Sequence, residues 1–352
     1  QALDLYLQGL KSDPENPKAN FQAGICYLET AYKEKSLPYL KKALQLKPDI
    51  HAQLLVFLGE AYQYNHQFPE AVKQYEAFLK TVDRNEPVTA HVNRRIYECH
   101  NGTRYLKEPV KAKIDNIGSV INSKYADFAP VISANEAVLV FTSRREGSVG
   151  GELTPDDNQF YEDMYITYKG NGTWTVPRNL KEINTDQHDA CVALSPDGKQ
   201  LFIYRDKNGG DLYSSNFDAV NNVWAKPQSL GDNINTKHYE PSISMTADGQ
   251  TIYFSSNRPG GAGGLDIYRS TKTPDGKWGE AVNLGPAVNT PYDDDAPFIH
   301  ADGQTLYFSS RGHAGMGGFD IYRTESQEDG SWSRPENLGY PINTADDDIY
   351  FV

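Results

Sequence analysis

Hydrophobic and polar residues alternate in short runs along the chain beyond Asn122. In one such run, the apolar residues 306–308 follow an Asp-Gly turn at Asp302 and precede two serines. Alternation of period two, bounded by Asp-Gly or Gly-Gly turns, predicts antiparallel strands joined by hairpins. We therefore expect this part of the chain to consist of short β-strands.

The runs belong to a repeat of about 50 residues. The repeats begin with Asn-Thr or Asn-Ser, at Asn122, Asn184, Asn235, Asn289 and Asn343. Each of the first four continues through an apolar strand and an Asp-x-Tyr step to a tryptophan, and this position accounts for all four tryptophans. Repeats of this kind are typical of propeller blades, whose sheets bury both faces only when neighbours pack on them. The Trp and Tyr side chains are expected to fill the space between blades.

We expect five blades, the last of them incomplete because the sequence reaches only Val352 within the fifth repeat. The segment from Val110 to Gly118 ends in Asn-Ile-Gly, which is similar to the Asn-Leu-Gly at the end of later repeats. We expect it to form an outer strand that pairs with the last blade, because this pairing would remove an exposed sheet edge.

The first hundred residues have a different period. Pro14 and Pro48 are 34 positions apart, and Gly24 and Gly59 are 35 apart, with apolar residues at helical spacing between them. This pattern predicts paired helices.

The helical pattern continues beyond these pairs. Residues 89–99 predict one more helix, and residues 101–109 predict a polar link after it. The sequence thus divides into a helical region, 1–104, and a propeller region, 105–352.

The helical region resembles tetratricopeptide repeats. One copy of that pattern is filled by Gly24, Tyr27, Ala43 and Pro48, and most of a second by Gly59, Tyr62, Ala71 and Tyr75. The second copy departs at its end, where Asp83 stands in place of proline. The resemblance implies an α-solenoid with a concave face that binds peptides or partner proteins. A rigid spacer that carries the propeller is the alternative.

Charge and composition exclude some functions. The formal net charge is −13 and the pI is near 5.1, which argues against nucleic acid as a partner. No apolar run is long enough for a transmembrane helix. The cysteines, Cys26, Cys99 and Cys191, have no paired or metal-ligand spacing, so we expect small buried thiols.

A carboxylate follows the first Asn of every repeat by five positions. These residues are Asp127, Asp189, Glu240, Asp294 and Asp348. Because inner strands line the axis of a propeller, we expect the five carboxylates to encircle the entrance of its channel. Arginines at the end of the second strand are their expected partners, namely Arg144, Arg205, Arg258 and Arg311. An open ring that binds a cation or a basic peptide is the alternative.

Catalysis is not expected from this set. Hydrolysis by paired carboxylates needs two groups in different environments, whereas these acids repeat with the blades. The glycine clusters 260–264 and 315–318 lie between strands, as hairpin turns do, and lack the helix that a phosphate loop requires. Asp293–Asp295 and Asp346–Asp348 could ligate calcium, but a solvated blade rim is preferred. We therefore expect no catalytic residue, no metal and no cofactor.

The blades resemble WD40-like repeats of the TolB type. Ser195-Pro196-Asp197-Gly198 matches the first turn of those repeats, Phe308-Ser309-Ser310-Arg311 the following strand, and Ile321-Tyr322 the last step. Helical repeats followed by such blades resemble a Bacteroidetes periplasmic family with an OmpA-like domain, which includes the PorE-type components of type IX secretion. The OmpA-like domain is absent from this sequence.

The resemblance implies a non-enzymatic periplasmic scaffold, associated with the outer membrane, whose partners are envelope proteins of a secretion machine. Peptidoglycan would be reached only through the absent domain. The alternatives are a propeller that binds or cleaves glycans and a purely structural spacer.

The first blade carries an insertion that we expect to contact a partner. Nineteen steps separate Arg144 from Asp163, whereas the equivalent path from Asn257 to Asp266 takes nine. Extra loop length on a repeat scaffold often carries binding specificity.

Overall fold

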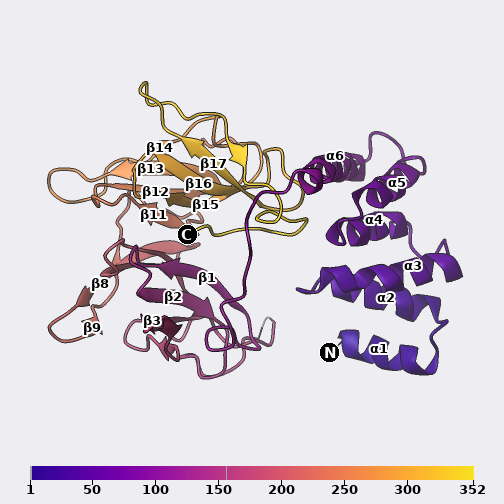
Figure 1. Cartoon of the computed structure of the whole chain (residues 1–352), viewed down its shortest axis with the longest axis horizontal. Helices are drawn as coiled ribbons and strands as arrows, with labels where there is room; N and C mark the ends of the chain where they lie inside the picture. Colours follow the sequence, from indigo (N-terminus) through magenta and orange to yellow (C-terminus); the bar gives the residue numbers. More distant parts are fainter. Residues whose placement is uncertain (1, 156) are drawn as a thin grey trace. The chain divides into compact units, whose positions relative to one another are not determined.

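The computed structural model describes residues 2–155 and 157–352, with helices in the N-terminal region and strands in the remainder (Figure 1). The helices are α1 (Ala2–Ser12), α2 (Pro17–Leu28), α3 (Ser36–Leu46), α4 (Leu54–Tyr64), α5 (Phe68–Leu79) and α6 (Pro87–Lys107), with a 3₁₀ turn η1 at Lys33–Lys35. No described helix is both long enough and apolar enough to cross a membrane.

The helices start and pack for local reasons. Proline in the first turn of α2, α5 and α6 has the φ angle that a helix needs and lacks an N–H that would go unpaired there. Gly24 and Gly59 lie where a Cβ atom would meet Leu40 at 2.6 Å and Tyr75 at 2.4 Å. These glycines allow α2 to approach α3, and α4 to approach α5. The tetratricopeptide assignment stays a prediction.

The predicted link at 101–109 is wrong, because α6 continues through Lys107. Gly102 lets α6 lie against the ring of Phe68, since an added Cβ would be 2.4 Å from it. The buried Asn101 side chain donates to the carbonyl oxygen of Gly315. Polar residues that looked like linker thus make tertiary contacts.

The chain forms two compact units. The first contains the residues up to Ala112 together with 314–320 and 338–348, and the second contains 113–313, 321–337 and 349–352. Two segments of the last repeats therefore belong to the same compact unit as the helices.

The β-rich part is a propeller of four blades, each an antiparallel sheet. The first blade consists of β1 (Asp127–Ile132), β2 (Val138–Ser143), β3 (Asp163–Gly170), β4 (Thr173–Trp174) and β5 (Arg178–Asn179). The second consists of β6 (Asp189–Leu194), β7 (Gln200–Arg205), β8 (Asp211–Asp218), β9 (Val223–Trp224) and β10 (Gln228–Ser229).

The third and fourth blades have four strands each in the same order. The third consists of β11 (Ile243–Met245), β12 (Thr251–Ser256), β13 (Asp266–Thr271) and β14 (Val282–Asn283). The fourth consists of β15 (Asp294–Ile299), β16 (Thr305–Ser310), β17 (Asp320–Glu325) and β18 (Glu336–Asn337).

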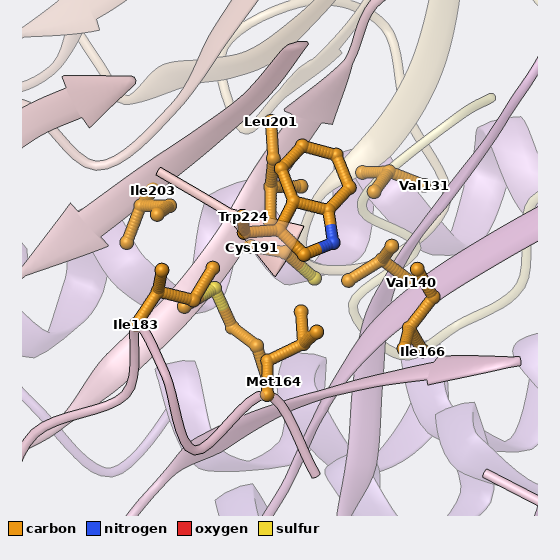
Figure 2. Packing of buried hydrophobic residues seen from close by; sticks show 10 residues of the cluster. Val131, Val140, Met164, Ile166, Ile183, Cys191, Leu201, Ile203 and Trp224 are labelled. Atoms are coloured by element: carbon orange, nitrogen blue, oxygen red, sulfur yellow. The ribbon is translucent and has the colours of Figure 1, made fainter. Parts of the chain in front are cut away.

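Tryptophans fill the spaces between blades, as the repeat predicts. Trp224 of the second blade lies among Val131 and Val140 of the first blade and Cys191 and Leu201 of its own (Figure 2). Trp278 and Trp332 occupy the same position in the next two interfaces. Trp174 in the first blade is only partly buried, beside a small cluster of its own blade.

The predicted fifth blade is not confirmed, and the strand expected at 110–118 is wrong. No strand precedes Asp127 in the described part of the chain. Val110 donates one backbone hydrogen bond to the carbonyl oxygen of Tyr340 (2.8 Å), but the exposed, charged residues after it do not continue a ladder. Cys99 and Cys191 are buried free thiols as expected, whereas Cys26 is partly exposed.

Replacing Trp224 with alanine should destabilise the propeller by about 3–5 kcal/mol, the usual cost of emptying a large aromatic site. The same change at Trp174 is the matched control and should cost clearly less, because that side chain keeps solvent contact. Urea unfolding followed by circular dichroism measures both losses. Equal losses would contradict the interfacial role of Trp224.

Candidate functional site

Each of the five repeated carboxylates accepts hydrogen bonds from the serine or threonine four positions before it. Asp189 accepts from the backbone N–H of Thr185 at 2.5 Å and from its hydroxyl at 2.6 Å. The same turn joins Asp127 to Ser123, Glu240 to Thr236, Asp294 to Thr290 and Asp348 to Thr344. The carboxylates thus fix the start of each repeat.

An arginine contacts the acid in the first three blades. The nitrogen–oxygen distances are 2.5 Å for Arg145–Asp127, 2.6 Å for Arg205–Asp189 and 3.5 Å for Arg258–Glu240. Each guanidinium also donates to the carbonyl oxygen just before the first Asn of its repeat, at Ile121, Ile183 and Ile234 respectively. The arginine therefore ties the acid turn to the preceding connector.

One of the predicted arginines does not take this place. The prediction for Arg144 is wrong in register, since Arg144 binds Asp157 and Arg145 binds Asp127. In the fourth blade the corresponding carbonyl oxygen, of Val288, lies 2.9 Å from Nε2 of His313. The expected pairing of Arg311 with Asp294 stays a prediction. A long side chain can reach one point from several backbone positions, so repeat spacing alone did not identify which arginine binds the acid.

The electrostatic state of the acid differs between blades. Burial raises the pKa of Asp127, but hydrogen bonds from Ser143, Arg145 and Ser123 outweigh burial and hold this pKa below its usual value. Burial raises the pKa of Asp294 to about 7, and hydrogen bonds from Ser310 and Thr290 oppose only part of that effect. Burial likewise raises the pKa of Asp348 to about 6.

The first Asn of a repeat joins that repeat to the blade before it. Asn289 accepts from the backbone N–H of Ile267 at 2.7 Å and donates to the carbonyl oxygen of Ile267 at 3.0 Å. Asn184 does the same with Met164, and Asn235 with Leu212. We call this pair of bonds the asparagine latch. The sequence marks its position by the repeated Asn-Thr, but the role of that asparagine was missed.

The second compact unit contains a cavity of about 350 Å³ on the propeller axis. Residues of the inner strands β1, β6, β11 and β15 line it, and the walls are largely apolar, with side chains such as Ile132, Leu194, Met245 and Phe298. Among the described residues that line it, none is one of the five repeated carboxylates. The acids are bound in their own turns, and their expected position around a channel entrance stays a prediction.

The segment after Asp348 forms part of the cavity wall. Tyr350, Phe351 and Val352 line the cavity, and the C-terminus lies beside β11 and β15 (Figure 1). The ring of Phe351 stacks on Tyr307 with centroids 4.2 Å apart and contacts Phe298. Apolar side chains of the chain itself thus cover this face of the fourth blade.

The acidic runs do not converge on one point. In the first run, Asp293 accepts from the Leu265 N–H, while Asp295 accepts from the hydroxyls of Ser242 and Ser255. Their carboxylates therefore serve different partners. Within the described ranges, no group of three or more metal-ligating side chains lies together.

The insertion in the first blade folds back on Arg144. Asp157 forms an ion pair with Arg144 at 2.6 Å, and residues 153 and 160 make an isolated bridge. Asp156 in this insertion lies outside the described residues. The expected partner contact of the insertion stays a prediction.

No protein-family model matches the chain, and no curated protein matches its sequence. Among solved structures it is similar to TolB from Acinetobacter baumannii, with 16% identity, a TM-score of 0.40, and coverage of 62% of this chain and 45% of that chain. A putative TolB from Agrobacterium tumefaciens gives 19% identity, a TM-score of 0.36, and coverage of 62% and 82%.

Another similar structure is the catalytic domain of a GH62 α-L-arabinofuranosidase from Coprinopsis cinerea. It has 12% identity and a TM-score of 0.39, with coverage of 64% of this chain and 74% of that chain. The chain spans less than half the length of the Acinetobacter TolB structure. At these identities and TM-scores, no chemistry is transferred to this chain.

Asn289→Ala should destabilise the propeller by on the order of 1–3 kcal/mol, because the buried N–H of Ile267 would lose its partner and the Ile267 carbonyl would keep only the Leu284 N–H. Asn122→Ala is the matched control: its amide donates to Asn116 in an exposed connector, so its loss should stay below about 1 kcal/mol. Denaturant unfolding compares the two, and similar losses would count against the latch.

Asp127→Asn and Asp294→Asn should change the pH dependence of stability in opposite directions. The raised pKa of Asp294 means that its stabilising contribution is lost as pH rises from about 4 towards 7, so Asp294→Asn should gain stability relative to the native chain over that range. The lowered pKa of Asp127 means that its contribution is lost as pH falls through and below about 4.

Asp127→Asn should therefore lose stability relative to the native chain as pH rises through that range. Unfolding free energies measured in urea from acidic to neutral pH give both differences. Parallel curves for the two variants would contradict the assigned pKa directions.

Proposed function

We propose that this chain is a non-enzymatic scaffold that binds protein partners in the bacterial cell envelope. The observation that carries the proposal is the use of the repeated carboxylates. In the first three blades the acid is bound by a threonine or serine and by an arginine of its own repeat. Groups held in this way stabilise the fold and are poorly placed to transfer protons to a substrate.

The finer assignment rests on the sequence motifs. The helices are proposed to be a tetratricopeptide solenoid, supported by the close approaches at Gly24 and Gly59. The blades are proposed to belong to a TolB-like periplasmic scaffold of a type IX secretion-like machine with an outer-membrane association. Peptidoglycan would be bound only by an OmpA-like domain that this sequence does not contain.

A fifth blade is part of the same proposal. The acid turn of the fifth repeat forms as in the other four, with Asp348 accepting from the N–H and hydroxyl of Thr344. The Asn122 amide donates to Asn116 as Asn289 donates to Asn283. The connector before the first blade thus has the local geometry found between blades, which suits a blade placed next to it.

Glycan binding is the second candidate. Tyr204 and Tyr239 lie edge to face with ring centroids 5.9 Å apart. Burial raises the pKa of Tyr350, in the cavity wall, and the charges of Asp295, Tyr239 and Glu162 raise it further. Aromatic faces beside a carboxylate are a common setting for sugar rings. A scaffold and a lectin differ in what they retain, which an experiment can separate.

The chain, immobilised through an added tag, should retain a defined set of envelope proteins identified by mass spectrometry. Altering exposed side chains, for example Leu5→Glu on α1 or Tyr97→Glu on α6, should remove particular members of that set. Val220→Glu, on an exposed hairpin of the propeller, is the matched control and should leave the helix-dependent members in place.

A glycan array and assays for peptide and polysaccharide hydrolysis complete the test. The second candidate would be favoured if the chain retained a specific glycan and the surface variants captured the same proteins as the native chain. Turnover of either substrate by the purified chain would contradict the non-enzymatic assignment.

A further inference from the structure

Three helix side chains bind three successive carbonyl groups of one segment. The Tyr105 hydroxyl donates to Ala314 at 3.0 Å, the Asn101 amide to Gly315 at 3.0 Å, and the Gln63 amide to Met316 at 3.3 Å. Asn101 and Tyr105 lie one turn apart on α6, and Gln63 lies near the end of α4. We call these three donors the carbonyl ladder. All six residues belong to the first compact unit.

The helices themselves orient the buried member of the ladder. Gln63 is only 1% exposed; its oxygen accepts from the Tyr75 hydroxyl at 3.0 Å and its nitrogen also donates to Glu98 at 3.3 Å. Glu98 is held in turn by Arg94 at 2.9 Å and Arg95 at 3.2 Å. The amide is therefore already positioned by groups of α4, α5 and α6, independently of the segment that it binds.

The Met316 side chain is the anchor of the bound segment. It is fully buried in a cluster with Phe68, Tyr75 and Cys99 of the helices. An unbranched, flexible thioether fits such an irregular apolar site well. At Gly317 a Cβ atom would lie 2.4 Å from the Ala345 carbonyl carbon, so a small residue is required after the anchor.

The blade does not need this methionine. Its counterpart in the third blade is Ala262, whose N–H donates to Asp266 as the Met316 N–H donates to Asp320. Ala262 is exposed, although it occupies the same turn. The same hairpin thus forms with alanine, and the methionine of the fourth blade serves the contact with the helices.

We propose that the face formed by α4 and α6 is a peptide-binding site, which the chain's own segment 314–318 fills, and that its external ligand is a peptide that carries methionine followed by glycine and adopts the bent conformation of that segment. This deepens the proposed scaffold function, on which it rests. The donors bind main-chain carbonyls, which every sequence offers, and the apolar site selects the methionine. An intramolecular ligand acts at an effective concentration in the millimolar range, so it excludes weak external peptides.

A labelled peptide with the sequence of residues 312–319, Gly-His-Ala-Gly-Met-Gly-Gly-Phe, tests the proposal on the full chain. The native chain should bind it weakly, because the site is filled. Met316→Ala copies the third blade and removes the anchor, so this variant should bind the probe at least about tenfold more tightly. Ala262→Met is the matched control in the equivalent hairpin and should leave binding at the native level.

The ladder gives the second arm of the test. Asn101→Ala combined with Met316→Ala should reverse the gain, and a probe with aspartate in place of methionine should not bind. Binding that survives either change would overturn the proposal. So would an absence of probe binding by Met316→Ala.

The reactivity of Cys99, which is buried beside Met316, reports whether the segment has left the helices. Together with Cys191 it also shows whether Met316→Ala is folded. In a Cys26→Ser background, Cys99 should react with a thiol reagent at least about tenfold faster in Met316→Ala than in the native chain, and saturating probe should restore its protection. Cys191, buried in the propeller, should stay unreactive throughout. A reactive Cys191 would mean that Met316→Ala unfolds the whole chain. In that case Met316→Lys, which also displaces the segment, replaces it, provided that Cys191 stays unreactive in that variant.

Cys99 that stays protected in both Met316 variants would overturn the anchor role. If the probe does not bind but the chain still captures envelope proteins through its helices, this inference is wrong and the scaffold function remains.

Discussion

The asparagine latch is the interaction on which the arrangement of blades depends. Adjacent blades meet at the strand of the Asp-x-Tyr step, where the Ile267 N–H donates to Asn289 and the Ile267 carbonyl oxygen accepts from both Asn289 and the Leu284 N–H. Buried backbone groups of this kind are costly when left unsatisfied. A single carboxamide offers one acceptor and one donor at a fixed spacing, so it satisfies both groups at once. The latch therefore sets the position of the next repeat, and the acid five residues after the asparagine lies at the start of the inner strand.

The acid turns add a charged layer to the same joint. Three arginines reach equivalent acids from different backbone positions: Arg205 is the last residue of β7, whereas Arg145 and Arg258 lie two residues beyond the ends of β2 and β12. The guanidinium, rather than its Cα, occupies the equivalent place. In the fourth blade His313 takes over the carbonyl contact, and the pKa of Asp294 rises because burial is less fully compensated.

Much of the fold could be predicted from the sequence, because strand alternation, hairpin turns and the place of tryptophan are local and repeat. The sequence position of each acid-binding arginine could not be predicted, because a long side chain reaches the acid from more than one backbone position. The continuation of α6 was missed for a different reason: Asn101 is buried by a partner 214 positions away, and no local pattern reports such a contact. The carbonyl ladder and the cavity likewise join residues that only the tertiary structure brings together.

The hairpin around Met316 belongs to two environments at once, and this restricts how the repeats can diverge. The hairpin of the third blade only has to turn the chain, so exchange of Ala262 for other small residues costs little there. In the fourth blade the same turn must also fit Phe68 and Gln63, which belong to another part of the gene. If the third blade were copied over the fourth, the hairpin would still form, but alanine would replace methionine and leave the site between the helices unfilled.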